Sequence, residues 1–341
     1  MGKEQFASTS PTPDSPTSAP TETSVKRLFK RGLQTPILDK MDLFQCIDFA
    51  AQEGFESLEV AAWKPLPPGQ KPSRRYADVA HLRVLDVLDE KTGPAEVEKI
   101  LAYSEEKGVE LASSLFCGNP LANPADAEWM LKVIQASAKL KIPVLTCFTG
   151  RVKDMNLEDS FQLLEKVFKP IVAEAERHDV KLAVEHCPML FTETEMPYGC
   201  NLMSTPAIWE RAFELIPSDN FGICIDISHF CWLGIDLIEP IYNFTSKIIA
   251  AHAKDIKVHR RKLERVGILA PPLDYMEPIL PGFGGDVPWA DYFDALYRIR
   301  FAGTVALEFE DKRFEPKKGE DDEITRRAIL KAKRFLDQFV V

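Results

Sequence analysis

The feature of this 341-residue sequence that most limits its fold is an alternation of short apolar runs with longer amphipathic stretches. Many of the apolar runs are rich in Val, Ile and Leu and nearly continuous, as in strands that are buried on both faces. Strands are predicted at residues 57–60, 109–115, 143–148, 181–185, 222–226, 248–252 and 304–308, with a first strand somewhere in 25–37. Helices are predicted between and after them, at 41–52, 94–107, 126–139, 157–178, 205–215, 288–299 and 322–339.

A strand followed by a helix, repeated about eight times, predicts parallel strands joined by right-handed crossovers. An open doubly wound sheet and a closed barrel both satisfy this pattern. No Gly-x-Gly-x-x-Gly motif follows the first predicted strand, which disfavours a dinucleotide-binding open sheet. The number of units and the chain length favour a single-domain α/β protein, a (β/α)8 TIM barrel over residues 26–341.

Three further features concern the segments around these repeats. Residues 1–25 are rich in Ser, Thr and Pro and are expected to form a disordered tail, because such a segment cannot bury a core. Residues 260–285 are rich in Pro and Gly and predict a long loop between the seventh strand and the seventh helix. Gly54, Gly108 and Gly303 each follow a predicted helix, where a left-handed residue is expected to end it.

The composition restricts the classes of partner and the compartment. A formal net charge of −10 opposes binding to nucleic acid or to a membrane surface, since both need a basic field. The apolar runs are too short to cross a bilayer. The seven cysteines contain no Cys-x-x-Cys pair and predict reduced, buried thiols in a cytoplasmic protein.

Four side chains at the ends of consecutive predicted strands indicate a metal site: Glu185, Asp226, His252 and Glu308. In a closed parallel barrel these ends share one rim, where active sites lie. Three carboxylates at close range repel each other, and a divalent cation removes that cost. Oxygen-rich ligation with one imidazole favours Mn²⁺, with Mg²⁺, Co²⁺ and Zn²⁺ also possible. A single carboxylate at a strand end is usually a helix cap or an ion-pair partner, so the prediction depends on all four together.

Five ordered segments resemble the sugar phosphate isomerase/epimerase family of the xylose isomerase-like barrel superfamily. They are VEHCPM (184–189), IDISH (225–229), AHAKD (251–255), LPGFG (280–284) and LEFE (307–310). The resemblance extends from about residue 40 to 340 and is specific as an ordered set. It implies the same four metal ligands, and it implies that His229 lies beside the metal and touches the substrate. His186 departs from the pattern, because many similar proteins carry Asn there.

The expected reaction is an isomerisation or epimerisation of a small keto sugar. The metal would hold a ketone oxygen and a neighbouring hydroxyl, with Glu185 and Glu308 as general base and general acid through an enediolate. His229 would hold a substrate oxygen or pass a proton. Five residues are candidates for substrate binding, although core packing or a solvated charge run would also explain several of them: His186, His229, Arg260, Trp63 and Phe116.

Other functions share this predicted site. A lyase or hydratase acting on a keto-inositol or a 3-keto-glycoside would use the same metal and base, and the sequence leaves this alternative open. A nuclease is disfavoured by the net charge and by only six histidines. A non-catalytic sugar-binding barrel is disfavoured by the complete ligand set. The resemblance also makes a homo-oligomer possible.

Overall fold

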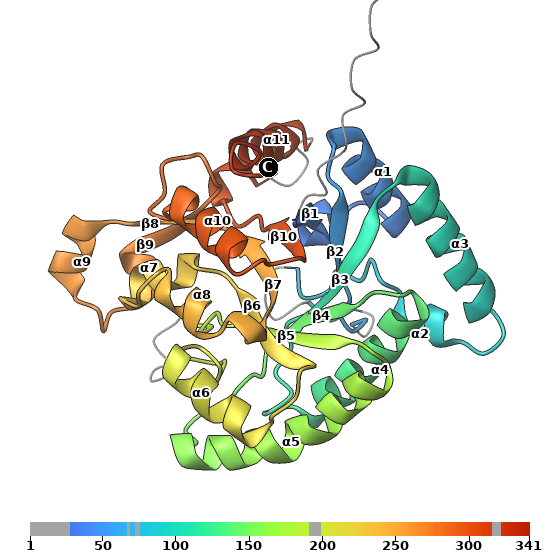
Figure 1. Cartoon of the computed structure of the whole chain (residues 1–341), viewed down its shortest axis with the longest axis horizontal. Coiled ribbons are helices and arrows are strands. Elements are labelled where there is room, and N and C mark those ends of the chain that lie inside the picture. Colours follow the sequence, from blue (N-terminus) through green and yellow to red (C-terminus); the bar gives the residue numbers. More distant parts are fainter. Residues whose placement is uncertain (1–27, 67–68, 72–75, 191–198, 316–321) are drawn as a thin grey trace, which may run out of the picture.

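The structure is a computed structural model that describes residues 28–66, 69–71, 76–190, 199–315 and 322–341 (Figure 1). The predicted tail at residues 1–25 lies outside the described residues. The described chain forms a closed barrel of eight parallel strands, in the order β1-β10-β7-β6-β5-β4-β3-β2. The predicted (β/α)8 fold is therefore confirmed.

The barrel strands agree with the predicted ones to within one residue at each end, and the first strand falls inside the predicted window. They are β1 (Lys30–Gln34), β2 (Ser57–Ala61), β3 (Glu110–Phe116), β4 (Val144–Cys147), β5 (Lys181–Glu185), β6 (Phe221–Ile225), β7 (Ile248–Ala253) and β10 (Thr304–Leu307). Long buried runs make these strands recognisable, because both faces of a barrel strand are covered.

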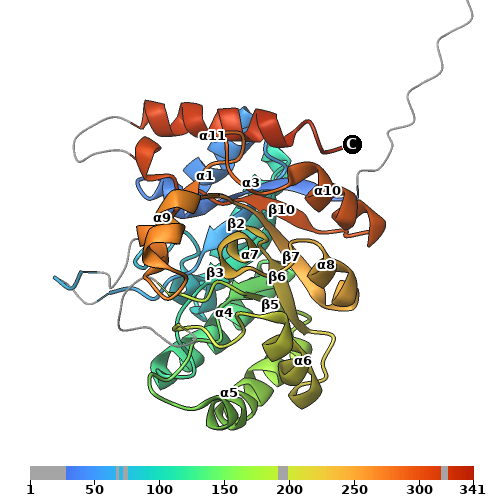
Figure 2. The same ribbon diagram turned by 90° about the vertical axis from the view of Figure 1, so that its left-hand side faces the viewer.

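The principal helices surround the barrel (Figures 1 and 2). They are α1 (Leu43–Glu53), α3 (Gly93–Lys107), α4 (Pro124–Lys139), α5 (Leu157–Arg177), α6 (Pro206–Leu215), α10 (Trp289–Arg298) and α11 (Glu323–Leu336). In α4, for example, Met130, Val133 and Ile134 are all buried, which is the spacing of one helical face. Gly54 ends α1 and Gly108 ends α3 with positive φ angles, as predicted.

Two predictions about connecting segments are wrong. Residues 260–285 are not a plain loop: they contain α9 (Arg260–Val266) and β9 (Met276–Ile279), and β9 pairs antiparallel with β8 (Asp255–Val258). No residue of α9 is buried, so the helix leaves no apolar periodicity in the sequence. After α10 the left-handed residue is Arg300, with φ 54°, and not Gly303.

Three further helices are too short to show a repeating apolar pattern and were not predicted. They are α2 (Val84–Leu88), α7 (Ser228–Leu233) and α8 (Glu239–Asn243). Of these, α7 matters for the site, because it follows β6 directly at the C-terminal rim of the barrel.

Candidate active site

The candidate site lies at the C-terminal ends of β5, β6, β7 and β10, which are neighbours in the barrel. The structure brings the four predicted ligand residues together there: one ligand atom from each of Glu185, Asp226, His252 and Glu308 lies within 4.8 Å of the others. All four side chains are buried. Glu185 and His252 occupy the ends of their own strands, and Asp226 and Glu308 directly follow theirs. Because parallel barrel strands end at one rim, these separate stretches of chain converge.

Three atoms of this cluster support a bound cation. Asp226 Oδ2, His252 Nδ1 and Glu308 Oε2 are buried and make no hydrogen bond of good geometry among the described residues. Their contacts are ion pairs: Lys254 Nζ lies 3.1 Å from Asp226 Oδ2, and His252 Nδ1 lies 3.3 Å from Glu308 Oε2. Unsatisfied buried polar atoms are costly, and a metal ion is one way to satisfy several at once. The oxygen-rich donor set, with one imidazole, fits a hard or borderline divalent cation.

Lys254 places its ammonium inside the same cluster. Its Nζ lies 3.0 Å from Glu308 Oε1, 3.1 Å from Asp226 Oδ2 and 3.4 Å from Glu310 Oε2. Burial opposes its charge, but Glu308 and then Glu310 hold the pKa of Lys254 well above its usual value. One ammonium among the carboxylates of Glu185, Asp226, Glu308 and Glu310 leaves an excess of negative charge, which a divalent cation would reduce.

Lys254 also favours the ionised form of a predicted ligand. Burial raises the pKa of Asp226, but Lys254 and then His229 outweigh it and hold that pKa well below the usual range. The sequence carried a signal for Lys254 that was not used. It follows His252 by two residues, and residues two apart along a strand point to the same side.

His229 and His186 occupy different positions in the site. His229, in the first turn of α7, places Nε2 3.1 Å from Glu185 Oε1 and 3.2 Å from Asp226 Oδ2. His186 is fully buried, stacks on Phe230 at 4.5 Å, and accepts a hydrogen bond of 3.0 Å from the backbone N–H of Asp226. Burial, followed by the charge of His229, holds the pKa of His186 well below its ordinary value. His186 therefore supports the backbone of a ligand and does not line the cavity.

Buried polar groups hold the ligands from behind. Asn201 donates to the backbone oxygens of Glu185 and Cys187, at 2.9 and 2.8 Å, and fixes the turn after β5. Glu59 contacts the ring of His252 from β2. Sequence reasoning missed Glu59, although a carboxylate in the middle of a fully buried strand was a usable signal. Asp255, which directly follows Lys254, does not contact the cluster in this way: it accepts a hydrogen bond from the indole N–H of Trp289 at 3.1 Å.

A cavity of about 390 Å³ opens onto the cluster. Glu185, Lys254 and Glu308 line its polar side. Its apolar side comes from the ends of the strands and the segments after them, with Trp63, Leu115, Cys117, Phe148, Cys187 and Met189.

Three further residues were predicted to contact the substrate, and only one of them lines the cavity. Trp63 lines the cavity, and Phe116 packs edge-on against Trp63, with ring centroids 5.3 Å apart, outside the set of lining residues. Arg260 lies exposed at the start of α9 and does not line the cavity.

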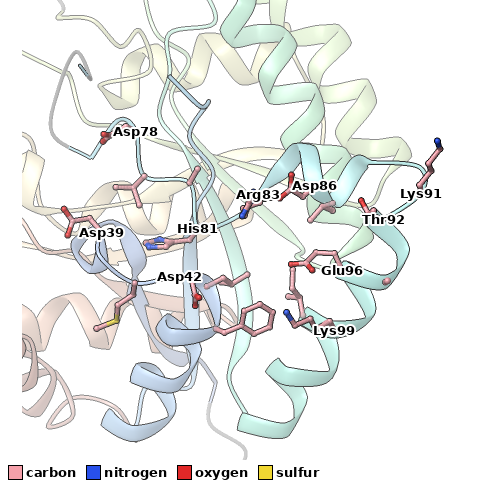
Figure 3. Close-up of a pocket in the computed structure, with 18 residues that line it drawn as sticks. Asp39, Asp42, Asp78, His81, Arg83, Asp86, Lys91, Thr92, Glu96 and Lys99 are labelled. Atoms are coloured by element: carbon pink, nitrogen blue, oxygen red, sulfur yellow. Dashed lines mark ion pairs between the residues drawn. The ribbon is translucent and has the colours of Figure 1, made fainter. Parts of the chain in front are cut away.

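A larger hollow, of about 1060 Å³, lies outside the barrel where α1, α2 and α3 meet; we call it the outer groove (Figure 3). Its labelled side chains include Asp42, His81, Glu96 and Lys99. Like the rim cluster, the outer groove is lined by acidic and imidazole side chains.

The fold and the rim cluster define an α/β barrel with carboxylate and histidine groups gathered at the end where such barrels carry out chemistry. The chain belongs to the xylose isomerase-like TIM barrel family, whose model matches residues 47–334. The YfiH protein of Bacillus subtilis (strain 168) is 23% identical over 323 residues, which is 85% of this chain and 95% of that protein.

Solved structures share the fold at low sequence identity. D-psicose 3-epimerase of Clostridium cellulolyticum H10 has a TM-score of 0.63 and 13% identity, covering 91% of this chain and 99% of that one. The probable 3-DHS dehydratase AsbF of Bacillus anthracis has a TM-score of 0.60 and 14% identity, covering 89% and 98%. One barrel fold therefore serves proteins named for epimerisation and for dehydration. In the described part of this chain, no helix combines the length and the apolar character needed to cross a membrane.

Proposed function

We propose that this protein is a divalent-metal-dependent isomerase or epimerase that moves a proton on a small keto sugar or sugar derivative. The observation that supports it most is the placement of two carboxylates, Glu185 and Glu308, beside one buried ammonium and one cavity. Two carboxylates that border the same substrate can remove a proton from a carbon and return one either to its opposite face, which epimerises it, or to the neighbouring carbon, which isomerises the sugar.

Glu185, Asp226, His252 and Glu308 would hold the metal, and Mn²⁺ is the ion we propose. When bound, it supplies Lewis-acid polarisation of the substrate's ketone. Glu185 would take the proton from the carbon beside the ketone, and Glu308, in its protonated form, would donate a proton to the enediolate. Each turnover would leave Glu185 protonated and Glu308 ionised until the two exchange protons with solvent. Each carboxylate can use one oxygen for the metal and the other for the proton.

Lys254 and His229 assist the transfer. The Lys254 ammonium faces the oxygen on which negative charge develops, and a fixed charge in a buried site stabilises such a charge strongly. His229, with Nε2 3.1 Å from Glu185 Oε1, orients that carboxylate and can relay its proton. The apolar wall that contains Trp63 would cover the carbon face of the substrate and exclude water.

A lyase is the second candidate, and Lys254 is the specific reason for it. A buried ammonium 3.4 Å from Glu310 and 3.0 Å from Glu308 can stabilise the negative charge that develops on a departing hydroxyl, while a protonated Glu308 would supply its proton. The metal and the base would be the same, and only the fate of the enediolate would differ.

The test is incubation of the Mn²⁺-loaded protein with a panel of keto sugars, keto-inositols and 3-keto-glycosides in D₂O, with products read by NMR. We expect deuterium at the carbon beside the ketone of one panel member, together with its epimer or isomer. An unsaturated product would support the lyase. A protein that binds Mn²⁺ but exchanges no proton on any member would contradict both reactions and favour a sugar-binding barrel.

A further inference from the structure

The buried contact between Glu59 and His252 has a consequence for how a metal would be held. Glu59 Oε2 lies 2.9 Å from His252 Nε2, and both side chains are about 1% exposed. Glu59 belongs to β2 and His252 to β7, so the contact crosses the interior of the barrel. Sequence separation of 193 residues means that only the closed barrel creates it.

The two nitrogens of the His252 ring face different partners. Nδ1 points to the rim, where it lies 3.3 Å from Glu308 Oε2 and has no hydrogen-bond partner among the described residues. Nε2 points into the barrel, towards Glu59. An ionised carboxylate has no proton to donate, so the hydrogen in the 2.9 Å contact belongs to Nε2. With Nε2 protonated, the neutral ring has its lone pair on Nδ1, the atom that faces the other ligands.

The carboxylate of Glu59 is itself held in place. Its second oxygen, Oε1, accepts a hydrogen bond of 3.0 Å from the hydroxyl of Ser113 on β3. The side-chain amide of Gln34 on β1 also lies 3.1 Å from His252 Nε2. With Nε2 protonated, the amide oxygen of Gln34 rather than its N–H₂ group must face the ring, and in that orientation it limits rotation of the ring. Residues on β1, β2 and β3, which contribute no metal ligand, therefore fix the orientation of the His252 ring.

From this geometry we infer that Glu59 is a positioning residue for the metal centre: it fixes His252 in the orientation and protonation form in which Nδ1 binds the cation. A partner on the outer nitrogen of a ligating imidazole raises the basicity of the ligand and holds its ring, and removing such a partner typically weakens metal binding 10- to 100-fold. The inference rests on the proposed metal-dependent function, although one of its readouts needs no metal.

The experiment compares the full-length chain with Glu59→Gln, Glu59→Ala and the control Glu110→Gln. Glu110 begins β3 at the exposed opposite end of the barrel, where it pairs with Lys30. Mn²⁺ affinity is measured by calorimetry. We expect affinity to fall about 10- to 100-fold in Glu59→Gln and further in Glu59→Ala, with no change in the control.

The second readout is the hydrogen-bonded imidazole proton of His252 in metal-free protein, assigned by its loss in His252→Asn. We expect a downfield, slowly exchanging resonance that shifts in Glu59→Gln and disappears in Glu59→Ala. Folded Glu59 variants that keep both the affinity and this resonance, even with a lower melting temperature, would overturn the inference. If the wild-type chain bound no Mn²⁺, the proposed function would fail, and the resonance alone would still decide whether Glu59 orients His252.

Discussion

The rim cluster and the outer groove contain similar side chains but use them differently. At the rim, Asp226 Oδ2, His252 Nδ1 and Glu308 Oε2 are buried, close together and without hydrogen-bond partners among the described residues. In the outer groove, His81 has a partner on each ring nitrogen: Thr35 Oγ1 at 2.8 Å and the backbone oxygen of Leu38 at 3.2 Å. The groove is the larger hollow, about 1060 Å³ against 390 Å³.

The acidic groups of the groove also have local structural roles. Asp42 caps α1: its carboxylate accepts a hydrogen bond from the backbone N–H of Gln45, and the side-chain oxygen of Gln45 accepts one from the backbone N–H of Asp42. Asp86 pairs with Arg83 at 2.6 Å, and Figure 3 shows these two side chains side by side. Lys99 lies over the ring of Phe44, 4.3 Å from its centroid. The rim is therefore the better candidate for a reaction site than the larger hollow, because its buried atoms converge without well-formed hydrogen bonds while those of the groove are used locally.

The largest expected effect concerns the rim. Replacing Glu308 by Gln removes a proposed acid and ligand, and should lower the rate of deuterium exchange by about 10²- to 10⁴-fold. The matched change Glu96→Gln, in the outer groove, should leave the rate unchanged. Exchange into a substrate found in the panel is the measurement. If the exchange rate fell by a similar factor in both variants, the assignment of the reaction to the rim and not to the outer groove would be contradicted.

A smaller effect is expected from the cap in the outer groove. Asp42→Ala should lower the free energy of unfolding by about 1 kcal/mol, because the first turn of α1 loses the side-chain acceptor for its N–H. Asp42→Asn should retain most of the stability, since an amide oxygen can still accept. Urea unfolding measures both variants. Exchange activity should not change, and a loss of activity at full stability would mean that the groove binds a ligand.

The smallest effect depends on pH. Burial lowers the pKa of His81 below its ordinary 6.5, despite the backbone hydrogen bond to Leu38. Below pH 6.5 the unfolded chain therefore takes up a proton that the folded chain resists, and stability falls until the folded-state pKa is passed. His81→Gln should be less stable at pH 8 but should lose less stability between pH 7 and 5. Denaturant unfolding across that range tests the sign: an equal or steeper loss in the variant would refute it.

Most of the barrel strands and principal helices could be predicted from the sequence. The buried runs that became β5 and β7 are continuous enough to give strand positions to within a residue, and Met130, Val133 and Ile134 show the helical spacing of α4. The exposed helix α9 and the β8–β9 pair could not be predicted from the sequence. Neither presents an apolar face of sufficient length, so tertiary contacts rather than local pattern determine them.

The site divides in the same way. The sequence by itself determined that Glu185, Asp226, His252 and Glu308 stand at strand ends, and strand ends of a parallel barrel must meet at one rim. Only the tertiary structure decided that His186 lies behind the cluster and that Glu59 reaches His252. These contacts join residues that are far apart in the sequence. They depend on how distant strands pair in the closed barrel, and a local sequence pattern does not determine that pairing.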